Sequence, residues 1–148
     1  MSSPTTQVTT HVDPVSQRQS LWKHGVAAAV VASAATTVLA AVASAAGVSF
    51  ADPTGASIPI ASFAQLTLVF SLVGVGIAAV MARKARRPRR TFTRTAVALT
   101  LLSYVPDLTF GFDPGSAATL IMLHTVAAGI VVPILAARLS AESADRRR

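Results

Sequence analysis

Four long apolar stretches, separated by polar segments, dominate the sequence. The first runs from Gly25 to Gly47 and the second from Ile60 to Ala82, and neither contains a charged residue. At a rise of about 1.5 Å per residue, a helix over either stretch reaches roughly 34 Å, which exceeds the hydrocarbon thickness of a bilayer, about 30 Å. The pattern therefore predicts two membrane-spanning helices in the first half of the chain.

Two further apolar stretches follow in the second half. One predicts a span over about residues 92–110, although it is shorter than the others. To cross fully, this helix needs Arg94 to snorkel toward the headgroups at one end and has to continue past Pro106 at the other. The last stretch predicts a span over residues 116–137. The expected fold is all-α: an integral membrane four-helix bundle built from two transmembrane helical hairpins.

Polar segments flank this transmembrane domain, which we place at residues 21–138. Residues 1–20 are rich in Ser, Thr, Gln and Pro and lack apolar periodicity, so we expect a disordered cytoplasmic tail. Residues 139–148 predict a charged cytoplasmic tail. The sequence Ala-Ser-Ala at 43–45 has the form of a signal-peptidase site, but the apolar stretch before it is too long for a signal-peptide core. We expect the first span to be retained.

Composition and charge placement support the membrane assignment. Apolar residues make up 52% of the chain and charged residues only 13%, and cysteine is absent, which excludes disulfides and thiol chemistry. A net charge of +7 would suggest nucleic acid in a soluble protein. Here, however, the thirteen Lys and Arg residues fall only before the first span, from the end of the second span to the first turn of the third, and at or after the end of the fourth. The positive-inside rule then predicts a multi-pass plasma (inner) membrane protein with both termini cytoplasmic, and no nucleic-acid partner.

Two similar Asp-Pro segments join the spans on the opposite, outer side. Asp52-Pro53-Thr54-Gly55 has the residues that a type I turn prefers, and Asp113-Pro114-Gly115 suits a type II turn, in which Gly supplies a positive φ. Duplication of a two-helix hairpin and convergent turn chemistry both explain the similarity.

Most of the chain after the N-terminal tail also resembles a known family. The segments "LSYVPDL" at Leu102–Leu108 and "LIMLHTVAAGIVVPIL" at Leu120–Leu135 are similar to small actinobacterial membrane proteins catalogued as a domain of unknown function (6069). The resemblance implies a four-helix integral membrane protein whose last helix carries a His, small residues and a Pro. The matching residues are His124, Ala127, Ala128 and Pro133. The family implies no activity.

Several polar residues fall at similar depth in the outer part of the predicted bundle. Ionisable side chains inside a membrane are costly and point to function, and an Asp-His pair at this depth could fix the orientation of the imidazole. The candidate outer polar pocket consists of His124, Asp107, Gln65, Tyr104 and Ser103. Similar depth leaves two alternatives open: His124 makes one structural hydrogen bond as a neutral imidazole, and Asp107 only caps or turns the chain.

A basic loop and several small residues suggest surfaces for other partners. The basic loop could bind anionic headgroups of the lipid bilayer at the cytoplasmic face, although topology alone explains its charge. It contains Arg83, Lys84, Arg86, Arg87, Arg89, Arg90 and Arg94. Small residues at suitable spacing allow close helix packing within the bundle or between protomers. They are Gly74 and Gly76, with Ala28 and Ala32 or Ala41 and Ala45.

The sequence contains no motif for enzymatic catalysis. A phosphate-binding loop, HExxH and GxSxG are all absent, so we expect no catalytic residues, metal site or cofactor. The favoured hypothesis is a non-catalytic accessory or assembly subunit that contacts another membrane protein or a second copy through its helices. One alternative is a small oligomeric transporter or channel. Another is a lipid- or quinone-binding sensor that uses the outer polar pocket.

Overall fold

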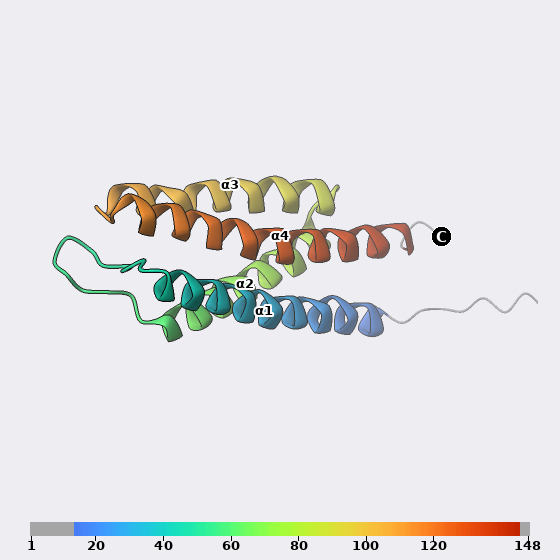
Figure 1. Cartoon of the computed structure of the whole chain (residues 1–148). Coiled ribbons are helices and arrows are strands. Elements are labelled where there is room, and N and C mark those ends of the chain that lie inside the picture. The colour runs from blue at the N-terminus through green and yellow to red at the C-terminus, as the bar shows by residue number, and fades with distance from the viewer. Residues whose placement is uncertain (1–13, 146–148) are drawn as a thin grey trace, which may run out of the picture.

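The computed structural model describes residues 14–145, and within them the chain folds into four helices without a strand (Figure 1). The predicted all-α class is therefore confirmed. The helices are α1 (Pro14–Ala45), α2 (Ile60–Lys84), α3 (Pro88–Thr109) and α4 (Pro114–Asp145).

The helices lie side by side, so that the three connections fall at two ends of the molecule (Figure 1). Helix α1 packs against both α2 and α4, whereas α3 packs mainly against α4. The connections at residues 46–59 and 110–113 lie together at one end, here called the loop end. The short connection at residues 85–87 lies toward the other end, the basic end, where α1 begins and α4 finishes.

Three of the four helices are long and apolar enough to cross a membrane. These segments are Leu21–Ala45, Ile60–Lys84 and Pro114–Ala141. Helix α3 is not among them, because arginines in its first two turns and Asp107 near its last turn lower its hydropathy. Three of the four predicted spans are thus confirmed by length and composition.

Both outer helices extend beyond the apolar stretches that predicted them. Helix α1 begins at Pro14, so residues 14–20, expected to be disordered, continue the helix, while the rest of that predicted tail lies outside the described residues. Helix α4 likewise runs to Asp145, through most of the segment expected to be a charged tail. Polar residues can extend a helix without adding to its apolar stretch, which is why hydropathy alone placed both boundaries too far inward.

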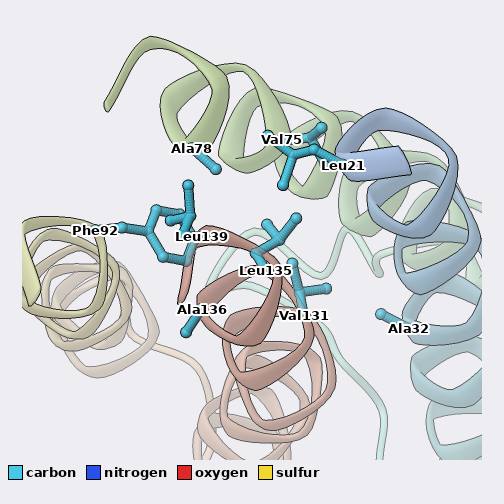
Figure 2. Close-up of a cluster of buried hydrophobic side chains, with 9 residues drawn as sticks. All are labelled: Leu21, Ala32, Val75, Ala78, Phe92, Val131, Leu135, Ala136 and Leu139. Atoms are coloured by element: carbon cyan, nitrogen blue, oxygen red, sulfur yellow. The ribbon is translucent and has the colours of Figure 1, made fainter. Parts of the chain in front are cut away.

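Two apolar clusters hold the bundle together, and α3 contributes to only one of them. The cluster near the basic end draws on all four helices (Figure 2). Its residues are Leu21, Ala32, Val75, Ala78, Phe92, Val131, Leu135, Ala136 and Leu139. The loop-end cluster consists of Ala40, Phe50, Phe63, Leu120 and Leu123. Phe92 is the α3 residue in the first cluster, and the buried part of the second contains none from α3.

Small residues allow α1 to approach its neighbours closely. A Cβ added at Gly25 would lie 2.7 Å and 2.8 Å from the two methyl carbons of Val75 on α2. Ala28 and Ala32, predicted to serve close packing, are buried on the same helix. Backbone proximity of this kind favours helix association in an apolar solvent.

The other small residues predicted to pack do not pack within this chain. A Cβ added at Gly74 or Gly76 would meet nothing within 4 Å, and Ala41 and Ala45 are exposed. Spacing at four residues identifies a small-residue stripe, but it does not say which side of the helix the neighbours occupy.

Buried hydroxyl groups also join α1 to α2. The hydroxyl of Ser33 donates a hydrogen bond of 2.8 Å to the carbonyl oxygen of Ala64. The hydroxyls of Thr36 and Thr67 lie 3.1 Å apart. Hydroxyl contacts between helices hold neighbours in register where no water competes for them.

The first Asp-Pro segment forms the predicted turn. The N–H of Gly55 donates to the carbonyl oxygen of Asp52 at 2.9 Å, which closes the turn. The Asp52 carboxylate accepts hydrogen bonds from the hydroxyl and the N–H of Thr54 at 2.6 Å and 2.8 Å. The side-chain hydrogen bond from Thr54 is the main cause that holds the pKa of Asp52 below its ordinary value.

The predicted type II turn at the second Asp-Pro segment is wrong. Pro114 and Gly115 are instead the first residues of α4, and Gly115 is not among the glycines with positive φ. Asp113 caps this helix: its Oδ1 accepts hydrogen bonds from the N–H groups of Gly115 and Ser116 at 2.9 Å and 3.0 Å. An Asp cap followed by Pro at the first helical position is a strong helix start, and it prevails over the turn.

The two loops contact each other through Ser116. Its hydroxyl accepts a hydrogen bond of 3.0 Å from the N–H of Phe50 and donates one of 2.5 Å to the Asp113 carboxylate. Phe50 is almost fully buried, and its φ of +50° is unusual for a residue with a bulky side chain. Its ring lies 5.0 Å from the ring of Phe63, centroid to centroid. These contacts hold the first loop against the start of α4.

Candidate functional site

The structure brings together two of the five residues of the predicted outer polar pocket. The Oδ2 atom of Asp107 on α3 lies 2.9 Å from Nδ1 of His124 on α4. Asp107 belongs to the last turn of α3, which continues through Pro106 to Thr109. The continuation of the helix past Pro106, required by the sequence prediction, therefore sets the position of this carboxylate.

Nδ1 of His124 also faces the carbonyl oxygen of Leu120, one turn earlier on α4, at 3.0 Å. A carbonyl oxygen can only accept, so a hydrogen bond at this distance requires the proton on Nδ1. Oδ2 of Asp107 is buried and has no hydrogen-bond partner within residues 14–145, despite its short distance from the ring nitrogen. The Asp107 carboxylate therefore lies close to an imidazole nitrogen whose hydrogen bond is accepted by Leu120.

The two side chains differ sharply in exposure. The Asp107 side chain is only 7% exposed, whereas the His124 side chain is 42% exposed. Because a neutral imidazole with its proton on Nδ1 has a lone pair on Nε2, the ring can accept a proton or a hydrogen bond there. The arrangement is a half-exposed base with a buried carboxylate beside its other nitrogen.

Tyr104 provides a second polar link between α3 and α4. Its hydroxyl lies 2.8 Å from the hydroxyl of Thr125, the residue after His124. Sequence reasoning named Tyr104 but missed Thr125, although Thr125 directly follows the histidine. It also missed the carbonyl of Leu120, which the four-residue spacing to His124 could have revealed.

Two other predicted pocket residues do not join this site. The hydroxyl of Ser103 donates to the carbonyl oxygen of Thr100 on its own helix at 2.6 Å. Gln65 is exposed on α2, and no hydrogen bond links its side chain to Asp107 or His124. The site that the structure supports is therefore narrower than predicted, and it lies between α3 and α4.

The basic residues form a separate surface around the connection between α2 and α3. All seven of them are exposed. Among the side chains that the structure describes, no carboxylate forms an ion pair with these seven cations. Charge is thus concentrated at the basic end, away from the Asp-Pro segments of the loop end.

Together, the fold and the site define an all-α protein of the membrane class, with three helices that can span a bilayer and an Asp-His contact between α3 and α4. The chain belongs to the Family of unknown function (DUF6069), whose model matches residues 16–141. The match includes α2 and α3 entirely and most of α1 and α4, and it confirms the family that the sequence resembled. No curated protein and no solved structure matches the chain.

Proposed function

We propose that the protein is a four-span protein of the plasma membrane, with both termini and the basic end in the cytoplasm. The support is the distribution of charge: seven exposed cations surround the connection at residues 85–87, while residues 46–59 and 110–113 contain no Lys or Arg. Cytoplasmic connections carry such an excess of basic residues in membrane proteins.

The order of the helices supports α3 as the fourth span. Helix α2 runs from the loop end to the basic end, and α4 begins again at the loop end (Figure 1). If α2 and α4 both cross the bilayer, the chain between them has to cross as well, and α3 is the element that does so. The polar residues of α3 then lie near its two ends. The arginines are at the basic end, and Asp107, beside His124, is toward the loop end.

Within this architecture, we propose that the protein binds a lipid-soluble molecule carrying a hydroxyl group, as a non-catalytic sensor. The observation that carries this proposal is the half-exposed His124, whose Nδ1 is held by Leu120 and lies beside the buried carboxylate of Asp107. The site lies about 15 Å along α4 from Pro114, in the outer half of the bilayer. Little water is present at that depth, so a ligand hydroxyl is the natural donor to Nε2.

The tautomer of His124 gives a direct test. Histidine labelled with ¹⁵N, in protein reconstituted in nanodiscs, reports the protonation of each ring nitrogen, and His124→Gln identifies the signal. We expect an Nδ1–H imidazole whose Nε2 resonance moves when a short-chain quinol is added and does not move with the matching quinone, which lacks the hydroxyl. An equal response to both compounds, or a response to neither, would overturn the ligand proposal.

A second candidate function, an assembly subunit, is supported by the uncovered glycines of α2. A Cβ added at Gly74 or Gly76 would meet nothing within 4 Å, so the surface is open to a helix of another membrane protein or a second copy. Leucine at both positions should abolish such association, measured by cross-linking in vesicles. Leucine at Gly129, an equally uncovered glycine on α4, is the matched control and should not. Equal association in wild-type and Gly74→Leu/Gly76→Leu protein would rule out this surface.

A further inference from the structure

Helix α3 has an uncharged stretch too short for the bilayer that it has to cross. Between Arg94 and Asp107 lie twelve residues, Thr95 to Pro106, which extend about 18 Å as a helix. The hydrocarbon layer is about 30 Å thick. The buried Asp107 side chain is next to His124, whereas at the opposite end of the stretch Arg94 forms no ion pair with any side chain that the structure describes.

Arg90 and Arg94 lie on the side of α3 that faces away from the bundle. They are four residues apart, one turn of helix, and both are exposed. Phe92, two residues from each and so on the opposite side, is buried in the basic-end cluster (Figure 2). The two guanidinium groups therefore form a pair along the outside of α3, and none of the carboxylates whose side chains the structure describes pairs with either.

We propose that Arg90 and Arg94 bind the phosphate of an anionic phospholipid in the leaflet at the basic end. Guanidinium groups present donors in a planar fork that matches phosphate oxygens. A phosphate drawn toward Arg94 also thins the bilayer locally, which fits the short uncharged stretch of α3.

The surrounding charge selects an anionic lipid over a zwitterionic one. A choline or ethanolamine headgroup would bring its own cation next to Arg86, Arg87 and Arg89, which are exposed in the same segment. A phosphatidylglycerol headgroup carries the phosphate without that cation, so its interaction with the cluster is attractive throughout.

The test uses the full chain in nanodiscs that contain phosphatidylglycerol and phosphatidylcholine, with native mass spectrometry to count the lipids that remain bound after release. We expect wild-type protein to retain phosphatidylglycerol, and Arg90→Gln/Arg94→Gln to reduce its retention roughly tenfold. The control Arg83→Gln/Lys84→Gln removes the same charge from the end of α2 and should leave retention near the wild-type level. Arg90→Lys/Arg94→Lys keeps the charge without the fork and should show reduced retention with the same lipid preference.

Two results would overturn the proposal. Equal losses in the two glutamine pairs would mean that only the total charge attracts lipid, and equal retention of both lipids would mean that no anionic-lipid site exists.

The inference rests on α3 crossing the membrane, which is tested separately. Single cysteines are introduced at Thr54, Ala85 or Thr109, and each variant is reconstituted in vesicles and labelled from one side. Labelling of positions 54 and 109 from one side and position 85 from the other supports the crossing independently of lipid binding. Any other pattern contradicts the four-span proposal itself.

Discussion

Pro53 in the first loop packs directly over Gly111 in the second. A Cβ at Gly111 would lie 2.7 Å from Cγ of Pro53, and Gly111 has a φ of +81°. We expect Gly111→Ala to lower the free energy of unfolding by about 2–3 kcal/mol, because backbone strain adds to the overlap. Reversible unfolding in mixed micelles measures the change.

The chain offers a matched control for this substitution. Gly55 has a similar φ of +86°, but a Cβ there meets nothing within 4 Å. Gly55→Ala should therefore show only the backbone cost, about 1 kcal/mol, and Pro53→Ala should relieve part of the penalty in Gly111→Ala. Equal effects at the two glycines would show that the loops do not touch in solution.

Gly25→Ala should destabilise the bundle although alanine is the better helix former. The added Cβ would lie 2.7 Å and 2.8 Å from the methyl carbons of Val75. Overpacking of this kind costs about 1–3 kcal/mol, against a gain of about 1 kcal/mol from helix propensity. Unfolding of Gly25→Ala, alone and with Val75→Ala, tests the contact. Gly129→Ala, at an uncovered helical glycine, should be neutral or stabilising, and a destabilisation as large as that of Gly25→Ala would contradict the prediction.

Ser116→Ala should loosen the first loop. The change leaves the buried N–H of Phe50 without its acceptor, which costs about 1–3 kcal/mol. Hydrogen exchange at the Phe50 amide should accelerate accordingly. Thr119→Ala is a suitable control because its hydroxyl donates only within α4, to the carbonyl oxygen of Gly115. Unchanged exchange in Ser116→Ala would show that the hydroxyl does not hold the loop.

Acid should weaken the loop end through Asp113. The hydrogen bond from the Ser116 side chain, with that from the Ser116 N–H, holds the pKa of Asp113 below its ordinary value of 3.8. A carboxyl group with a lowered folded-state pKa stabilises the fold above its unfolded pKa, and this contribution is lost as the pH falls from near 3.8 through the lowered value. Unfolding measured from pH 6 to pH 3 should show a smaller loss in Asp113→Asn than in wild type. Identical pH profiles would contradict this assignment.

His124 and Asp107 should be coupled in stability. Replacing His124 by Leu leaves a carboxylate buried without a neighbouring imidazole, whereas replacing both residues by Leu removes the buried charge as well. We expect His124→Leu/Asp107→Leu to be more stable than His124→Leu alone, with a coupling of about 1–3 kcal/mol in a double-mutant cycle. Tyr104→Phe paired with His124→Leu serves as the control cycle. Additive effects of the His124 and Asp107 changes would show that the two side chains act independently.

The sequence predicts how far along its helix a residue lies, but it does not predict the direction in which the residue points around the helix axis. Apolar stretches and helical rise place Asp107 and His124 at similar depth, and the structure brings them together. The same reasoning gave Gln65 and Ser103 a similar depth, yet neither joins the pair. Depth follows from counting residues, whereas rotation depends on which neighbours each helix selects, and no single stretch of sequence contains that information.

The turn prediction from local sequence was right at the first Asp-Pro segment and wrong at the second. Asp52 begins a turn in which the chain leaves one helix and returns to another after several residues, so the local preference decides the outcome. Asp113 is followed directly by an apolar stretch, and its carboxylate caps the helix that this stretch forms. The residues Asp, Pro and Gly favour both structures, and the residues that follow them determine which one forms.

The hydrogen bond between Phe50 and Ser116 joins residues 66 positions apart, which has a consequence for biosynthesis. When the first two helices have just been synthesised, the residue that completes their loop has not yet been made. The N–H of Phe50 can find its acceptor only after α4 has started to emerge and its first turn has reached the loop end. A truncated or misinserted chain therefore keeps an open first loop that proteases can reach, so closure of this loop marks the chain whose insertion is complete.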